Sequence, residues 1–366
     1  MRVLMTTDTV GGVWTFTQEL AGGLLDRGCS VYLVSLGGTP SESQESWFNH
    51  MQQKWGANFR HEAWNTPLEW MEENVRAFYL PAAWLIRIAC KWKADLLHSS
   101  QFCFGSLPPE IPRIVTAHSD VLSWADSCRD GVLEDSAWLR RYKTLVADGL
   151  RAADKVVCPS NWMAQALTRN FEVPGEVVVI PNGRSLSAPR QHCRLQAVTA
   201  GRLWDEAKNI GILRDVRSPI PIYVVGENQQ GSKKAAGFLR DDRLLGSLSQ
   251  ENVLKLFRES AIYICTSRYE PFGLAPLEAA LCGCAVIAND IPSLREVWGD
   301  GALYFRGSEA LASLLRELCG SRDSLADAQR CSLLRARQYS AERMTESYVK
   351  LYRTALTKSE KTAYVA

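Results

Sequence analysis

Apolar residues occur along the chain in short blocks that alternate with glycine turns and amphipathic stretches. The blocks at 2–7 (RVLMTT) and 29–36 (CSVYLVSL) predict buried strands, and residues 11–28 between them open on two glycines and continue with a helical pattern. A strand, a helix and a strand in this order predict a parallel sheet with helices on its faces. Further strands in this half are expected at 95–100, 113–119, 155–160 and 176–183.

A second series of strand blocks begins at 194–203. Two series predict an α/β protein with two Rossmann-like domains, and 366 residues are more than one core usually serves. We expect a first domain over 1–185, a second over 186–340 with a hinge near 181–190, and a closing helix and tail over 341–366. In the second domain, strands are expected at 220–227, 261–267 and 284–290, and helices at 249–260 and 293–299.

Composition indicates an ordinary globular protein and excludes some partners. Hydrophobic residues make up 46% of the chain and charged residues 22%, and the net charge of +2 comes without a run of Lys and Arg, so nucleic acid is not expected as a partner. The 11 cysteines form no C-x-x-C pair and fit reduced thiols in the cytoplasm. The N-terminus has no long apolar run, so we expect no signal peptide. No metal-ligand spacing is found among His50, His61, His98, His118 and His192.

Two glutamates stand in the otherwise apolar segment 267–288. Glu270 lies in the loop after the 261–267 strand, and Glu278 lies in a helix expected over 274–281. At helical rise their separation is about 12 Å, more than the roughly 5–9.5 Å of a glycosidase pair. The two carboxylates therefore suit two contacts on one long ligand, unless both merely stabilise the N-terminus of the helix.

The same helix is expected to begin in a turn suited to an anion. Pro276 fits its first turn and Gly283 ends it. The N–H groups of Phe272, Gly273 and Leu274 would then point out of the positive end of the helix, where phosphate binds readily.

Cations and glycines follow other strands. Arg202 and Lys208 flank the loop after the 194–203 strand and would suit a diphosphate, a forked guanidinium beside a point charge. They converge only if this loop folds back, and otherwise they are solvated surface cations. Gly11 and Gly12 follow the first strand, where they allow close approach to a phosphate or simply form a tight turn, without the full G-x-G-x-x-G of a nicotinamide site.

Three further features leave alternatives open. His118 lies just past a strand, at the rim where open α/β sheets bind ligands, and is either catalytic or structural. Ten of the 12 tryptophans precede residue 185, and Trp14, beside the glycine turn, is our candidate for contact with an acceptor, although packing explains most of them. Residues 76–93 are apolar and basic, which fits a core helix better than peripheral contact with a membrane surface.

Taken in order, these motifs resemble the family 4 retaining glycosyltransferases of GT-B fold. Glu270 and Glu278, in E-P-F-G-L-x-x-x-E, are similar to the E-x7-E signature of that family. The resemblance covers nearly the whole chain. It includes GGV at 11–13, PNG at 181–183, GRL at 201–203 with Lys208, GSLSQENVLKLF at 246–257 and IPSLREV at 291–297.

The resemblance implies two Rossmann-like domains facing each other across a cleft that holds a nucleoside-diphosphate sugar. It implies that Glu270 contacts hydroxyls of the donor sugar, that Glu278 holds the ribose, and that Arg202 and Lys208 bind the diphosphate. It also implies roles for backbone and neighbouring groups: the N–H groups near Gly12, Gly273 and Leu274 at the diphosphate, Leu248 at the base, and His118 near the donor sugar.

The implied reaction moves a hexose from a UDP- or GDP-linked donor to a hydroxyl of a glycan, a lipid-linked sugar or a small molecule, with retained configuration. No cofactor or metal is implied besides the donor. The sequence departs from the family at SDVLSW after His118 and at VVGENQQG (224–231), which leaves the acceptor and the base open. The alternatives are a sugar-nucleotide epimerase of the same architecture and a non-enzymatic carbohydrate-binding protein.

Overall fold

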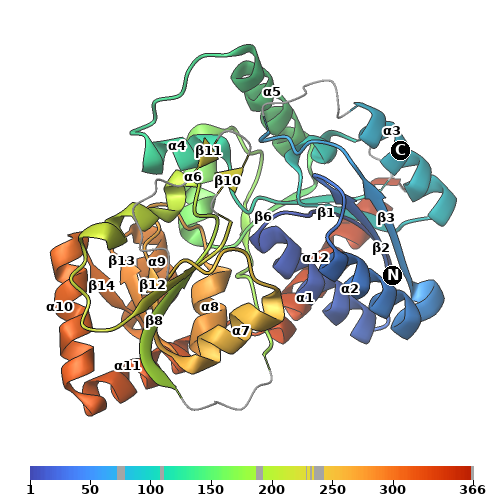
Figure 1. Cartoon of the computed structure of the whole chain (residues 1–366). Coiled ribbons are helices and arrows are strands. Elements are labelled where there is room, and N and C mark those ends of the chain that lie inside the picture. The colour runs from blue at the N-terminus through green and yellow to red at the C-terminus, as the bar shows by residue number, and fades with distance from the viewer. Residues whose placement is uncertain are drawn as a thin grey trace. The chain divides into compact units, whose positions relative to one another are not determined.

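The computed structural model describes residues 1–71, 79–107, 111–186, 193–227, 229–230, 233–234 and 243–363 (Figure 1). The chain divides into two compact units, Met1–Ala125 with Gly131–Gly183 and Ala341–Ala366, and Asp126–Asp130 with Arg184–Ser340. The division after Gly183 falls inside the expected hinge at 181–190, and the C-terminal segment belongs to the first unit.

The first unit is built on a seven-stranded parallel sheet with the order β3-β2-β1-β4-β5-β6-β7. Its strands are β1 (Arg2–Asp8), β2 (Ser30–Leu36), β3 (Phe59–Trp64), β4 (Leu96–Ser99), β5 (Arg113–Thr116), β6 (Lys155–Cys158) and β7 (Val178–Val179). The strand expected at 176–183 is therefore reduced to two residues. β3 was not predicted, because an edge strand with the polar centre Arg60, His61 and Glu62 lacks an apolar block.

Helices cover the first sheet and bury two apolar clusters against it. They are α1 (Gly12–Asp26), α2 (Glu42–Trp55), α3 (Tyr79–Trp92), α4 (Val121–Cys128), α5 (Ala137–Ala152), α6 (Asn161–Asn170) and α12 (Ala341–Ala363), with the 3-10 turns η1 (Gly56–Asn58) and η2 (Phe102–Ser106). The C-terminal helix α12 packs against α1.

Helix α3 occupies most of the basic, apolar stretch predicted at 76–93. Leu85 and Ile88 are buried in the core cluster over the sheet, and Trp84 packs edge-on against Trp64 of β3. The interpretation as a core helix is confirmed, and contact of its outer face with a membrane stays a prediction. Within the described residues, no helix is long and apolar enough to span a membrane.

The second unit is built on a five-stranded parallel sheet with the order β14-β13-β12-β8-β9. Its strands are β8 (Arg194–Ala200), β9 (Ile222–Val225), β12 (Ser260–Cys265), β13 (Ala285–Asn289) and β14 (Leu303–Phe305), and β10 (Gln229–Gln230) pairs with β11 (Lys233–Lys234) apart from it. The helices are α7 (Gln250–Glu259), α8 (Leu274–Leu281), α9 (Pro292–Trp298), α10 (Gly307–Gly320) and α11 (Arg322–Ala336), with the 3-10 turns η3 (Glu206–Lys208), η4 (Ile210–Asp215) and η6 (Gly299–Gly301).

The α/β class with two parallel sheets is thus confirmed. The central strand β12 is buried along its whole length, with one apolar cluster on each face of the sheet. Helix α8 has the predicted bounds, because Gly273 and Gly283, both with positive φ, flank it. The predicted features at His192 and at 187–190 lie outside the described residues.

A buried histidine ties the C-terminal helix to the first sheet. His98 of β4 is 1% exposed, and its Nε2 lies 2.7 Å from Thr116 Oγ1 and its Nδ1 2.6 Å from Tyr352 Oη. Burial lowers the pKa of His98 to about 3, with a smaller contribution from the nearby His118. The imidazole is therefore neutral in the folded protein near pH 7.

This histidine predicts that stability falls on mild acidification. In the unfolded chain His98 takes up a proton below its ordinary pKa of about 6.5, while the folded chain does not until about pH 3, so stability is full above 6.5 and lost as the pH falls. Between pH 7 and pH 5 the loss from His98 alone is about 2 kcal/mol. Urea unfolding at pH 7 and pH 5 measures it. The difference should shrink by that amount in His98→Gln, and an equal difference in both proteins would contradict the account.

Candidate active site

The loop after β8 folds back on itself, which brings its two cations to one place. Asp205 caps the 3-10 turn η3 by accepting a hydrogen bond from Ala207 N at 3.0 Å, and it also accepts one from Arg202 Nη2 at 2.8 Å. The turn brings the side chain of Lys208 against Gly201. A Cβ on Gly201 would lie 3.2 Å from Lys208 Cδ. Arg202 and Lys208 therefore converge, as the diphosphate hypothesis required.

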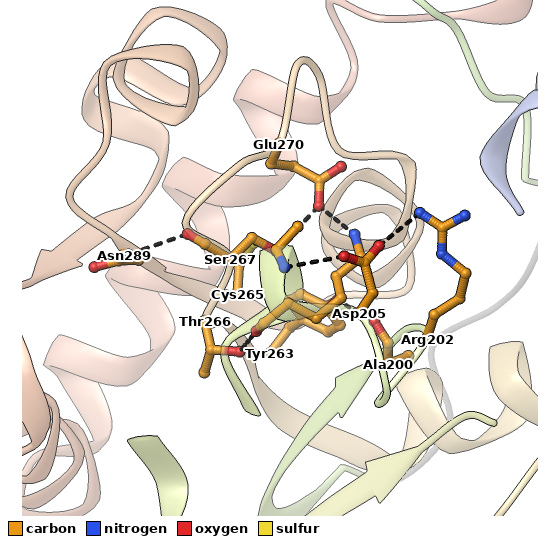
Figure 2. Close-up of polar contacts among 11 residues, drawn as sticks. Ala200, Arg202, Asp205, Tyr263, Cys265, Thr266, Ser267, Glu270 and Asn289 are labelled. Atoms are coloured by element: carbon orange, nitrogen blue, oxygen red, sulfur yellow. Dashed lines mark hydrogen bonds and ion pairs between the residues drawn. The ribbon is translucent and has the colours of Figure 1, made fainter. Parts of the chain in front are cut away.

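Lys208 makes an ion pair with Glu270. Its Nζ donates to Glu270 Oε2 at 2.6 Å, and the two side chains are 21% and 15% exposed. Burial of the ammonium opposes its charge, but the Glu270 carboxylate and its hydrogen bond outweigh this and raise the pKa of Lys208. Ser267 Oγ also lies 3.1 Å from Glu270 Oε2, so two groups fix this carboxylate oxygen (Figure 2).

Hydrogen bonds join the loop after β8 to the loop after β12. Thr266 Oγ1 donates to Lys208 O at 2.6 Å, Arg268 N donates to Ala207 O at 2.7 Å, and Asn209 Nδ2 donates to Thr266 O at 3.3 Å. Figure 2 shows that Asn289, from the end of β13, reaches Ser267, whose carbonyl oxygen accepts its amide hydrogen at 3.0 Å. The pair of charges is therefore held by strand ends that lie far apart in the sequence.

A close backbone approach in the second unit requires a glycine. A Cβ on Gly226, which has φ +140°, would lie 1.7 Å from Gly201 O. Any side chain at this position would push the loop after β9 away from the loop that carries the two cations.

The turn before α8 requires a glycine, and its role as an anion site stays a prediction. Gly273 has φ 91° and ψ 80° and precedes the first helical residue, Leu274. A Cβ on Gly273 would lie 2.9 Å from Pro276 Cγ and 3.2 Å from Glu270 Cγ, so this position needs glycine for its conformation and for its space. Phe272 is buried and packs edge-on against Tyr339 at 5.2 Å, which fixes the turn from the core side.

Glu278 is held by a nearly dry ion pair. Arg184 Nε donates to Glu278 Oε1 at 2.8 Å, and the two side chains are 9% and 11% exposed. Arg184 is placed by its own backbone, because its N–H donates to Tyr339 O at 3.0 Å. The same tyrosine thus supports both Phe272 and Arg184.

Cys265 at the end of β12 is not a nucleophile at neutral pH. Burial, and after it the charge of Glu270, raises the pKa of its thiol to about 11. Leu248 lies just before Ser249, the N-cap of α7, and packs half-buried on the apolar cluster that contains α8. Its predicted contact with a base stays a prediction.

Four predicted residues belong to the first unit. Gly11, with φ 69°, caps α1, and Gly12 is the first residue of that helix. Trp14 packs edge-on against Trp47 and Phe48 of α2, each at 5.2 Å, so part of its ring serves packing and its role toward an acceptor stays a prediction.

His118 follows β5, with its ring 4.5 Å from Phe16. Its Nε2 is buried and has no hydrogen-bond partner among the described residues. Burial lowers the pKa of His118 to about 3, so it is neutral at pH 7. A neutral imidazole can accept or donate one hydrogen bond there, but it does not supply a positive charge.

Some residues that shape the site were missed from the sequence. Asp205 lies three positions after Arg202, and Ser267 lies three before Glu270, which are local spacings that could have drawn attention to them. Arg184 gave no such signal, because it lies 94 positions from Glu278.

Two family models match the chain. Residues 10–188 match Glycosyltransferase Family 4, and residues 208–331 match Glycosyl transferases group 1. The chain belongs to this family of glycosyltransferases. A curated relative of the glycosyltransferase is alpha-maltose-1-phosphate synthase of Mycolicibacterium smegmatis, 23% identical over 318 residues that cover 71% of this chain and 79% of that one.

Solved structures show that the glycosyltransferase has the predicted GT-B architecture. Sucrose-phosphate synthase from Thermosynechococcus elongatus superposes with a TM-score of 0.77 at 18% identity, covering 98% of this chain and 100% of that one. HepE of Anabaena, solved in complex with UDP-glucose, has a TM-score of 0.72 at 16% identity, covering 97% and 100%. These likenesses show the fold alone.

Proposed function

We propose that this glycosyltransferase transfers a hexose from a UDP- or GDP-linked sugar to a hydroxyl group of a glycan, a lipid-linked sugar or a small molecule. The observation that carries the proposal is the ion pair of Lys208 and Glu270, held at 2.6 Å by two loops that hydrogen bond to each other. This pair supports the proposal because an ammonium could meet the charge of a phosphate while the adjacent carboxylate accepts hydrogen bonds from sugar hydroxyls.

The reaction is a front-face displacement that retains the anomeric configuration. The bond from the anomeric carbon to the diphosphate oxygen breaks, the acceptor oxygen forms its bond on the same face, and the departing phosphate takes the hydroxyl proton. Arg202, Lys208 and the N-terminal end of α8 stabilise the negative charge that grows on the diphosphate. Glu270 orients the sugar, and Glu278 binds the ribose.

We propose that the donor binds without a divalent metal, because Lys208 and Arg202 meet the charge of the diphosphate. UDP is the first candidate, since a structural neighbour was solved with UDP-glucose.

A thermal-shift panel of UDP, GDP and ADP in excess chelator tests both points. A nucleotide present at 100 times its dissociation constant should stabilise the second unit by about 2.7 kcal/mol. Adding Mg²⁺ or Mn²⁺ should change the shift little. A shift that appears only with the metal would contradict metal-free binding, and no shift with any nucleotide would contradict the proposed function.

A further inference from the structure

A buried glutamine in the first unit has an amide oxygen without a hydrogen-bond donor among the described residues. Gln101 follows β4 and is 1% exposed. Its Nε2 donates to Asp8 Oδ1 at the end of β1, whereas its Oε1 is buried and accepts no hydrogen bond from any described residue. The bond to Asp8 fixes which end of the amide is the nitrogen, so the oxygen is the unmet atom.

The backbone at Gln101 and at the two residues after it is fixed by hydrogen bonds. Ser99 Oγ donates to Gln101 O at 2.7 Å and accepts from Gln101 N at 3.0 Å. The next two N–H groups, of Phe102 and Cys103, donate to the buried Glu69 carboxylate at 2.8 and 3.1 Å. Gly149 packs so closely that a Cβ there would lie 1.8 Å from Phe102 O. Sites held on rigid elements of this kind keep their geometry when a ligand binds.

The surrounding groups follow neighbouring strands. β1, β4 and β5 are adjacent in the sheet, so Asp8, Gln101 and His118 lie along its carboxyl edge, where ligands of open α/β sheets bind. Thr6 Oγ1 and Ser99 Oγ, 2.9 Å apart, join β1 to β4 just below this edge. His118 Nε2 is another buried polar atom that has no partner in the part of the chain that the structure describes. A buried acceptor that has lost water and gained no donor destabilises the protein, and a ligand O–H group would satisfy it.

We propose that Gln101 Oε1 and the Asp8 carboxylate form a subsite for hydroxyl groups of a sugar or polyol acceptor, with His118 beside them. This inference rests on the proposed glycosyl transfer and adds the residues that choose the acceptor. An uncharged O–H group fits best, because it can donate to the amide oxygen and accept a hydrogen bond in return. Gln101 in this account positions the acceptor and takes no part in breaking the donor bond.

Saturation-transfer NMR in the presence of UDP tests the subsite, with D-glucose, maltose, myo-inositol and glycerol as probes. Gln101→Met keeps the length of the side chain and removes the oxygen. It should weaken the best-bound probe about twofold to tenfold, the loss of one neutral hydrogen bond, while the dissociation constant of UDP stays the same. Gln101→Asn withdraws the same amide by one methylene and should also weaken the probe, which covers the case in which Gln101→Met does not fold.

The control is Gln329→Met in α11 of the second unit. Gln329 is similarly buried at 7%, and its Nε2 donates to Ala261 O at 3.0 Å. This variant should leave probe binding unchanged. Unchanged probe binding in folded Gln101 variants, or no binding of any probe to the natural protein, would overturn the subsite and leave a bound water as the partner of Gln101. If the natural protein did not bind UDP at all, the result would instead contradict the proposed function.

Discussion

Replacing Lys208 with methionine should lower kcat by at least about tenfold while the KM for the donor changes less. Negative charge grows on the diphosphate as the sugar–phosphate bond breaks, so a cation there stabilises the transition state more than the bound donor. A charged hydrogen bond contributes about 1.5–3 kcal/mol, or roughly 10- to 150-fold in rate. Lys208 also fixes Glu270 at 2.6 Å, so its loss frees the carboxylate that orients the sugar.

Steady-state kinetics with saturating acceptor measure this effect. Lys255→Met, on the exposed side of α7, is the matched control and should leave both constants unchanged. Arg202→Lys should retain part of the activity, because the charge remains while the planar fork that pairs with Asp205 is lost. A rise in KM alone for Lys208→Met, at an unchanged melting temperature, would make these cations plain binding groups.

Loss of Arg184 should destabilise the second unit by about 3–5 kcal/mol, the usual cost of leaving a buried charge without its partner. Arg184 and Glu278 are both nearly buried and pair at 2.8 Å, so Arg184→Met removes the ion-pair partner of a buried carboxylate. Replacing both, as Arg184→Met with Glu278→Leu, should recover most of the loss, because two apolar side chains pack where two charges were desolvated.

Urea unfolding followed by circular dichroism compares these variants. Arg140→Met removes an ion pair with Asp135 in which the two side chains are 63% and 75% exposed. This variant should shift the urea midpoint of unfolding little. Equal shifts for Arg184→Met and Arg140→Met would show that the buried pair contributes no more than a surface one. A double variant as unstable as Arg184→Met alone would point to strain rather than to an unpaired charge.

The sequence predicted elements with strong local signals and missed those that depend on distant contacts. The bounds of α8 were predicted because Gly273 and Pro276 mark the beginning of the helix and Gly283 marks its end. β3 was missed because its side chains alternate irregularly at the sheet edge, and its place is set by pairing with β2. A strand of this kind can be predicted only when the strand that pairs with it is known.

In the candidate site too, single residues were predicted from local signals, whereas their contacts with distant residues were not. Lys208 and Glu270 were each predicted, but their ion pair joins positions 62 apart and follows from the strand order that sets β8 beside β12. Arg202 and Lys208 converge because Asp205 caps the turn between them, a hydrogen bond that the sequence alone did not indicate. Arg184 and Gln101 could not be predicted, since their roles depend on burial and on partners in distant segments.

The release of nucleoside diphosphate from UDP-glucose and GDP-mannose, measured with excess chelator and a panel of sugar acceptors, tests metal-free transfer with retained configuration. At least one donor should give the free nucleotide together with a glycoside of the same anomeric configuration, read by NMR. Lys208→Met should slow this release at least about tenfold, whereas Lys255→Met should not. No release from either donor, or a product of inverted configuration, would contradict the account.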